Sequence, residues 1–261
     1  LDYAETRLYQ NGDEPRQIHW RATARTGRLQ VRSHHQDVAP FACLVVDRRA
    51  PMRFGTRVRL KVVQAARLAF FLAARDVRRG AEVAALLLGE PDLWLPPAAG
   101  AHALQRLARC LVQPCPPLDA DSAARALAPT IGSLAGRLPP GSRLTVISDF
   151  GDLVPADTAT LARLGRRYDC RARLICDVAE RSMPRIGPLA VHWSGRAVVL
   201  DWRDPRQRAA HELAFRDRQA ELIALLAGAL WQVATLDAAR EDLAAAPSAD
   251  DGDERAAVPR H

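Results

Sequence analysis

The sequence contains one lysine, Lys61, although its formal net charge is +7. The other basic residues are arginines, which are scattered among acidic residues and form no stripe. A nucleic-acid-binding surface needs clustered basic side chains together with exposed aromatic rings, and aromatic residues make up only 5% of this chain. We therefore expect an ordinary charged surface and no nucleic-acid partner.

Long apolar runs are also missing. A helix that crosses a bilayer needs about 20 mostly apolar residues, and the longest candidate, residues 58–75, is interrupted by Arg59, Lys61 and Arg67. We expect a buried amphipathic helix there, in a cytoplasmic protein. The chain begins with Leu1 instead of Met, so we expect a fragment, and tethering to a membrane through an anchor upstream of Leu1 stays open.

The cysteines are odd in number, and their spacing excludes common metal knuckles. Cys110 and Cys115 are separated by four residues, and Cys170 and Cys176 by five. A structural zinc site usually has closer cysteine pairs, completed by further ligands. We expect buried free thiols in a reducing compartment.

Motifs of common enzymes are absent from the sequence. It has no G-x-S-x-G elbow, no H-E-x-x-H, no P-loop and no G-x-G-x-x-G. Ser148 adjoins Asp149, and His19 and His102 are available, so a hydrolase stays an alternative, as does a nucleic-acid-binding module. We predict that the protein is not an enzyme.

Two short apolar runs, residues 41–47 and 144–149, each end in a carboxylate. Unbroken apolar runs with β-branched residues are typical of strands buried on both faces of a parallel sheet. Strand and helix patterns alternate along the chain, which predicts an α/β fold with a doubly wound, mostly parallel sheet. The carboxyl ends of such strands meet in the crevice where ligands bind. If these two strands are neighbours, Asp47 and Asp149 should face each other there.

The remaining patterns predict the other elements. Helices are expected at residues 56–79, 100–111, 123–138, 157–167 and 204–226 and after Asp237; further strands are expected at residues 81–88, 92–95, 171–177 and 232–235, with a hairpin at 189–202. Residues 92–95 should pair antiparallel at the sheet edge.

Three regions follow from these patterns. Residues 1–40 are expected to form an extended arm, incomplete upstream, whose Tyr9, Ile18 and Trp20 pack on the main domain. Residues 41–245 are expected to form the α/β domain with a C-terminal hairpin–helix extension. Residues 246–261 lack apolar periodicity, so we expect a disordered tail.

Several motifs occur in a characteristic order. The arm reads R-x-Y-x-x-G-D-x-x-R-x-I-x-W from Arg7 to Trp20, followed by A-R-T-G-R; later come V-V-D, M-R-F-G-T, S-D-F and an aspartate with M-P, ending at Asp47, Thr56, Phe150 and Pro184. The chain resembles the bacterial domain-of-unknown-function family 58, whose members are similar to von Willebrand factor type A domains. The family usually has aspartate where this chain has His19.

The resemblance implies a metal-ion-dependent adhesion site. Type A domains carry D-x-S-x-S after the first strand, and here that motif reads Asp47-Arg48-Arg49-Ala50-Pro51. Magnesium needs six oxygen ligands, whereas proline and guanidinium offer no acceptor. The resemblance places the other metal ligands at Asp121 or Ser122 and at Asp149. We therefore predict a degenerate site and no cofactor.

Three interpretations of this site stay open. Arg49 could bridge Asp47 and Asp149 through its guanidinium fork, in the place of the metal. The arginines could instead project into water while the aspartates cap helices. The third interpretation is a type A domain that keeps a residual divalent-metal site, for which Mg²⁺ is the candidate.

The function that we predict is a non-enzymatic protein–protein interaction or adaptor domain. Five residues should gather at the same sheet edge as an apolar pair rimmed by charges, which is typical of a docking patch: Arg48, Arg49, Met52, Phe54 and Asp152. The resemblance implies that a MoxR-type AAA+ ATPase is the partner, together with an unidentified client protein.

Overall fold

The computed structural model describes residues 6–8, 20–32, 40–115, 125–193 and 196–243. The chain divides into two units, residues 1–39 and 40–261. In the first unit, β1 (Thr6–Leu8) pairs antiparallel with β2 (Gln30–Arg32), and α1 (Trp20–Thr26) lies between them in the chain.

Helix α1 shows that the predicted extended conformation was wrong for residues 20–26. Alanine and arginine favour a helix, and Gly27 ends it with a φ of 67° and an N–H donated to the carbonyl of Thr23 at 2.9 Å. Tyr9 and Ile18 lie outside the described residues, and the packing of this unit on the main domain stays a prediction.

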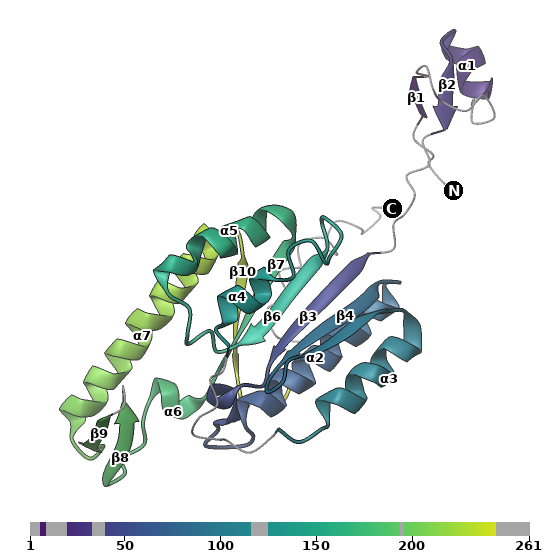
Figure 1. Ribbon diagram of the computed structural model, residues 1–261. Helices are drawn as coiled ribbons and strands as arrows, with labels where there is room; N and C mark the ends of the chain where they lie inside the picture. The colour runs from purple at the N-terminus through teal and green to yellow at the C-terminus, as the bar shows by residue number, and fades with distance from the viewer. Residues whose placement is uncertain (1–5, 9–19, 33–39, 116–124, 194–195, 244–261) are drawn as a thin grey trace, which may run out of the picture. The chain divides into compact units, whose positions relative to one another are not determined.

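The second unit is built on a mostly parallel sheet (Figure 1). In the described part of the chain this sheet has six strands, in the order β10-β7-β6-β3-β4-β5. Their bounds are β3 (Phe41–Asp47), β4 (Glu82–Leu88), β5 (Leu93–Ala98), β6 (Arg143–Ser148), β7 (Asp169–Cys176) and β10 (Gln232–Asp237). Only β5 runs antiparallel to its neighbour among these strands. The predicted fold class and the antiparallel edge are confirmed.

Helices cover both faces of this sheet (Figure 1). On one face, α2 (Lys61–Arg78) and α3 (Gly100–Leu111) pack against Leu44 and Val46 of β3. On the other face, α4 (Leu127–Gly132), α5 (Thr158–Arg167) and α7 (Pro205–Gly228) pack against Val45. Because side chains alternate along a strand, an apolar run such as residues 41–46 fills two cores at once. This double burial fixes the polar end of the strand, Asp47, at the sheet edge.

The C-terminal part of the unit contains the predicted hairpin and helix. Strands β8 (Pro188–Trp193) and β9 (Arg196–Asp201) pair antiparallel. Asp204 caps α7 by accepting the N–H of Arg206 at 2.8 Å. The turn at residues 194–195 and the predicted tail, residues 246–261, lie outside the described residues.

Three predicted helices differ from the structure. Helix α2 begins at Lys61, because residues 54–60 form a loop with its own contacts. In the predicted helix at 123–138, only residues 127–132 are helical in the described part, and Gly136 has a φ of 93°. No helix follows Asp237 among residues 238–243, where the Asp237 carboxylate accepts the N–H of Ala239 at 2.8 Å in a turn. In each case, contacts that stabilise a loop or turn outweigh the helix propensity of the residues.

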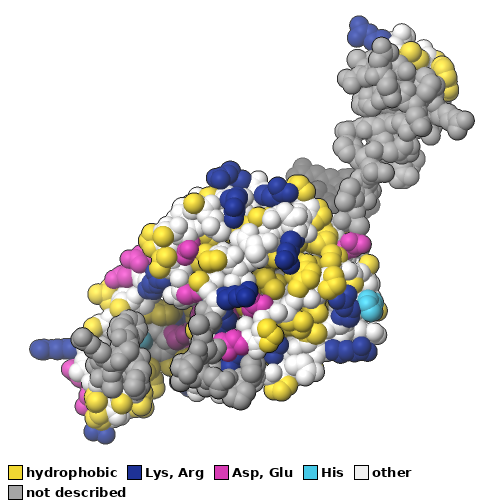
Figure 2. All heavy atoms as spheres, viewed as in Figure 1, with side chains coloured by type: hydrophobic (Ala, Val, Ile, Leu, Met, Phe, Trp, Pro, Cys, Tyr) yellow, Lys and Arg dark blue, Asp and Glu magenta, His cyan; other side chains and the backbone are white. Residues whose placement is uncertain are grey.

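The remaining short elements connect the strands at the carboxyl edge. They are the 3₁₀ turns η2 (Ala50–Arg53) and η3 (Pro155–Asp157) and helix α6 (Val178–Arg181). On the face of the main unit that Figure 2 shows, arginine side chains lie at separate places among hydrophobic and acidic ones, with no continuous basic stripe in view.

Two helical glycines give a matched test of the packing between α5 and the end of α7. A Cβ added at Gly165 would lie 2.1 Å from the carbonyl oxygen of Ala229, whereas one added at Gly228 meets nothing within 4 Å. We expect Gly165→Ala to lower the free energy of unfolding by about 1–3 kcal/mol. Gly228→Ala should leave it unchanged or raise it by up to about 1 kcal/mol. Urea denaturation measures both, and equal effects would contradict this packing.

Candidate functional site

Asp47 is the centre of an ionic cluster at the carboxyl edge of the sheet. Its side chain, 1% exposed, receives Nε of Arg49 at 3.0 Å on Oδ1 and Nη2 at 2.8 Å on Oδ2. The hydroxyl of Ser148, at the end of β6, donates to Asp47 Oδ2 at 2.6 Å. Both carboxylate oxygens of Asp47 are therefore engaged inside the protein.

The Arg49 guanidinium also binds a second carboxylate. Its Nη1 lies 2.7 Å from Asp152 Oδ2, and its Nη2 lies 3.2 Å from Asp152 Oδ1. Nη1 donates in addition to the carbonyl of Arg125 at 2.8 Å. A guanidinium has five N–H donors, and these contacts use all of them. Arg49 thus joins β3, the loop after β6 and the chain just before α4.

The pKa shifts follow from these contacts. Burial by itself lowers the pKa of Arg49, but the hydrogen bonds to Asp47 and Asp152 outweigh it and raise the pKa above its ordinary value. For Asp152, burial raises the pKa, while the Arg49 guanidinium and the N–H of Leu127 lower it more, so its pKa lies below the ordinary value. Both groups are charged at neutral pH.

Lys61 forms a second cluster at the same edge. Its Nζ lies 2.8 Å from Asp149 Oδ2 and 2.6 Å from Glu180 Oε1, and its side chain is 1% exposed. Burial by itself lowers the pKa of Lys61. The charges of Asp149 and Glu180 raise this pKa by more than burial lowers it, so it lies above its ordinary value. A buried ammonium therefore holds the loop after β6 to α6.

Asp149 does not share Arg49 with Asp47, so that part of the first interpretation was wrong. Ser148 and Asp149 are consecutive and point to different partners, as residues along an extended chain do. Ser148 reaches Asp47, whereas Asp149 reaches Lys61. Strands β3 and β6 are neighbours, as the interpretation required, and arginine does neutralise Asp47, but the second carboxylate on Arg49 is Asp152.

A third aspartate, Asp177, fixes the loop at residues 54–60. Its carboxylate accepts the N–H of Thr56 at 3.0 Å, the Thr56 hydroxyl, and the N–H of Ala179 at 2.9 Å. Burial raises the pKa of Asp177, but these hydrogen bonds outweigh it and lower the pKa below its ordinary value. A Cβ on Gly55 would lie 2.4 Å from the carbonyl oxygen of Arg59, so the loop is closed tightly at its start.

The predicted docking residues are only partly accessible. Met52, at 0% exposure, and Arg49, at 6%, are buried, so the prediction that they line an exposed patch was wrong. Met52, in η2, belongs to the apolar core that contains residues of α2 and β3. Arg48 is half-buried and donates to the carbonyls of Cys110 and Gln113 at 3.3 and 2.5 Å. Phe54 and the Asp152 carboxylate remain reachable, at 42% and 35% exposure.

The residues present do not fit a magnesium site. Asp47 is engaged by Arg49 and Ser148, and Asp149 by Lys61 and by the N–H of Gly151 at 3.1 Å. Among the described residues, no group of three or more His, Cys, Asp or Glu side chains is placed to hold a metal ion. Asp121 and Ser122 lie outside the described residues. A cation from solution would have to displace a buried guanidinium or ammonium.

Lys61 and Glu180 are the residues that sequence reasoning missed. Lys61 was interpreted only as an interruption of an apolar run. A usable signal was present, because it is the one lysine in a chain whose Lys and Arg residues total 37. Asp177 and Glu180 form a capping box at the start of α6, with the Asp177 N–H donated to Glu180 at 2.8 Å. That D-x-x-E spacing could have been recognised as well.

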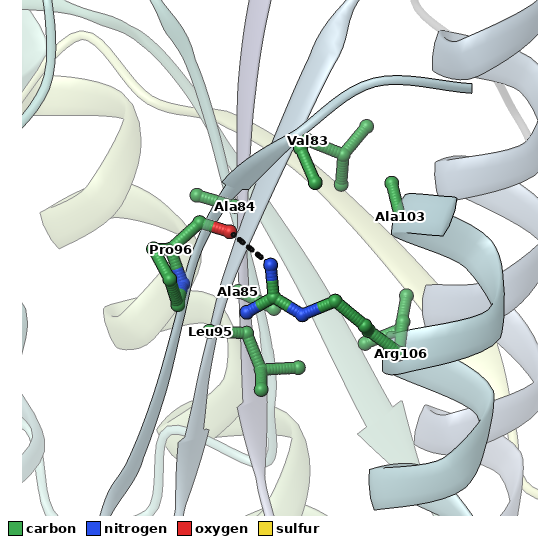
Figure 3. A pocket seen from close by; sticks show the side chains of 9 residues that line it. Val83, Ala84, Ala85, Leu95, Pro96, Ala103 and Arg106 are labelled. Atoms are coloured by element: carbon green, nitrogen blue, oxygen red, sulfur yellow. Dashed lines mark hydrogen bonds between the residues drawn. The ribbon is translucent and has the colours of Figure 1, made fainter. Parts of the chain in front are cut away.

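A small cavity between β5 and α3 is no ligand site. Its volume is about 10 Å³, and Arg106 closes it by donating to the carbonyl of Pro96 at 3.4 Å (Figure 3). That volume holds at most about one water molecule.

The Arg49 contacts predict a large and pH-dependent effect of Arg49→Ala. Removing one partner of a buried pair costs about 3–5 kcal/mol, because it leaves Asp47 and Asp152 facing each other without a cation. Since Arg49 lowers the pKa of Asp152, its contribution is present at pH values above about 4 and is lost as the pH falls through the lowered value. The deficit in unfolding free energy should thus be full at pH 7 and shrink in acid.

Arg125→Ala is the matched control. Its side chain is 82% exposed and lies 3.9 Å from Asp92, so its loss should cost less than about 1 kcal/mol. Urea denaturation at pH 7 and pH 3.5 measures both variants. Similar costs for the two substitutions, or a deficit for Arg49→Ala that does not change with pH, would contradict the geometry.

Comparisons with known proteins agree with the resemblance noted above. A family model described as "Protein of unknown function DUF58" matches residues 5–221. The uncharacterized proteins Rv1480 of Mycobacterium tuberculosis (strain ATCC 25618 / H37Rv) and Mb1516 of Mycobacterium bovis are each 28% identical over 235 residues, which is 86% of this chain and 70% of theirs.

Solved structures show a weaker likeness. The conserved hypothetical protein BatB from Bacteroides thetaiotaomicron has a TM-score of 0.43 and 14% identity, covering 71% of this chain and 98% of that one. An aerotolerance-related membrane protein from Bacteroides fragilis has a TM-score of 0.43 and 13% identity, covering 72% of this chain and 98% of that one.

In the part of the present chain that the structure describes, every helix is too short or too polar to cross a bilayer. On the extent of the family match, the chain belongs to the DUF58 family.

Proposed function

We propose that this chain is a non-enzymatic protein-interaction domain whose docking loop is held in place by internal ion pairs instead of a metal ion. The observation that carries the proposal is that two side-chain cations, instead of a metal ion, neutralise the carboxylates at the sheet edge. Arg49 binds Asp47 and Asp152, and Lys61 binds Asp149 and Glu180. These carboxylates therefore form the ion pairs that hold the segments of the sheet edge together.

Four buried groups that could act as nucleophiles, Ser148 and three cysteines, are poorly placed for catalysis. The Ser148 hydroxyl is buried, donates to Asp47 and accepts the N–H of Phe150 at 3.0 Å, so a substrate has no path to it. Burial raises the pKa of the Cys43, Cys170 and Cys176 thiols to about 12. A thiol with so high a pKa stays protonated and unreactive at neutral pH.

The docking loop is residues 54–59 of the loop at residues 54–60. It exposes Phe54 and Val58, at 42% and 60%. Asp177 holds Thr56, and the N–H of Lys61 donates to the carbonyl of Phe54 at 2.8 Å. A loop that is already ordered loses little conformational entropy when it binds, and apolar side chains with a polar rim are typical of interaction sites.

The partner that we propose is a MoxR-type AAA+ ATPase, with a client protein of unknown identity. This part rests on the family resemblance. We place the interaction in the cytoplasm, which is supported by the five cysteines, all of them free thiols. A tether upstream of Leu1 is compatible with this placement.

A binding measurement with purified proteins tests the proposal. The full chain should bind the MoxR-type ATPase of its own organism, and Phe54→Ser with Val58→Ser should weaken binding by about tenfold or more, since both side chains would lose apolar contacts. Leu213→Ser is the control, because Leu213 is 54% exposed on α7 and is not part of the loop.

Two results would overturn the proposal. Undiminished binding by the Phe54→Ser, Val58→Ser variant would exclude the loop as the docking surface. The absence of binding by the unmodified chain at tens of micromolar would exclude the ATPase as the partner. A melting temperature equal to that of the unmodified chain is required of each variant.

A further inference from the structure

Helices α2 and α3 border an open groove that the cluster at the sheet edge does not use. Its volume is about 1040 Å³, and it extends from Cys115, after α3, to Leu243, the last described residue. Small-molecule pockets usually measure about 300–1,000 Å³. The groove is therefore as large as the largest of these and open along its length.

The walls of this groove are apolar where a surface helix is normally polar. Along α2, Val63 and Phe70 recur at helical spacing and are 44% and 40% exposed. The other side of the same helix buries Leu68 and Leu72 in the core. An amphipathic helix keeps its outer face polar, so apolar side chains on both sides indicate a second packing partner. On the α3 side, Val112 is 76% exposed.

The charged side chains that line the groove, among the described residues, are all arginines. Arg48, Arg53, Arg67 and Arg78 line it, and no Asp or Glu is among the described residues that do. Arg48 donates to the carbonyls of Cys110 and Gln113. Arg67 donates to the Gln64 side chain and to the carbonyls of residues 240 and 241. These acceptors of Arg48 and Arg67 are neutral groups.

We propose that this groove binds an amphipathic helix of a partner protein that carries acidic residues beside its apolar face. The apolar floor would bury the leucine-like side chains of such a helix, as in other helix-in-groove complexes. The arginine rim would bind its carboxylates through guanidinium forks. A concave groove suits an inserted helix better than the flat surface of a bilayer. The groove lies outside the ionic cluster at Asp47 and Lys61, so this inference and the proposed function can fail separately.

A pair of designed peptides tests the proposal on the full chain. The acidic probe is an 18-residue fluorescent peptide with leucines at helical i, i+3, i+4 and i+7 positions and glutamates at the others. The basic probe has lysines in place of the glutamates. Fluorescence anisotropy should show binding of the acidic probe, weakened by added salt, and at least about tenfold weaker binding of the basic probe.

Substitutions in the groove should change this binding in a defined direction. Phe70→Gln should weaken binding of the acidic probe, because it removes apolar contact from the floor. Arg78→Glu should weaken the acidic probe and strengthen the basic one. Arg166→Glu, at an exposed position of α5, changes the net charge equally and should have neither effect. Leu213→Gln is the control for Phe70→Gln. Unchanged melting temperatures exclude unfolding as the cause.

Other results would overturn the inference. Equal binding of both probes, no binding of either, or equal loss in the control variants would each exclude a site for an acidic helix. Binding of phosphatidylglycerol vesicles without binding of the acidic probe would assign the face to a lipid surface. Binding that appears only when the chain is ended after Leu243 would assign the groove to the chain's own C-terminal residues.

Discussion

A carboxylate at the buried end of a parallel strand needs a compensating charge, and the carboxyl edge of this sheet is organised by that requirement. Asp47 is 1% exposed, and an uncompensated buried charge is very costly. Arg49, two residues later, supplies the cation and brings Asp152 and the start of α4 to the same point. Because one guanidinium joins three segments, the edge is fixed by charge pairing as well as by the cores beneath it.

The two internal cations differ in a way that suits their sites. Arg49 faces two carboxylates in a planar fork and uses every N–H donor, which is the geometry that guanidinium provides. Lys61 is the first residue of α2, and its ammonium lies between Asp149 and Glu180 as a compact charge. The chain uses arginine at every other basic position.

Much of the main unit could be predicted from sequence, because double burial leaves strong apolar runs in β3, β4 and β6, because periodicity marks α3 and α5, and because Asp204-Pro205 marks the start of α7. The loops escaped prediction. Residues 56–60 were included in a predicted helix, but Asp177, distant in sequence, binds Thr56, and the segment forms bends before α2. The pairing of Arg49 with Asp152 depends on how the chain turns at Phe150, which has a φ of 54°. Sequence spacing carries no information on that direction, so Asp149 was assigned in its place.

The most direct test of internal cation substitution is a double-mutant cycle at Lys61, measured by urea denaturation at pH 7. Lys61→Met in the unmodified chain should cost about 3–5 kcal/mol, since two carboxylates would lose their shared cation. In a background that carries Asp149→Asn and Glu180→Gln, the same substitution should cost much less, because no charge is left without a partner. Equal costs in the two backgrounds would show that Lys61 contributes only packing and would contradict the account.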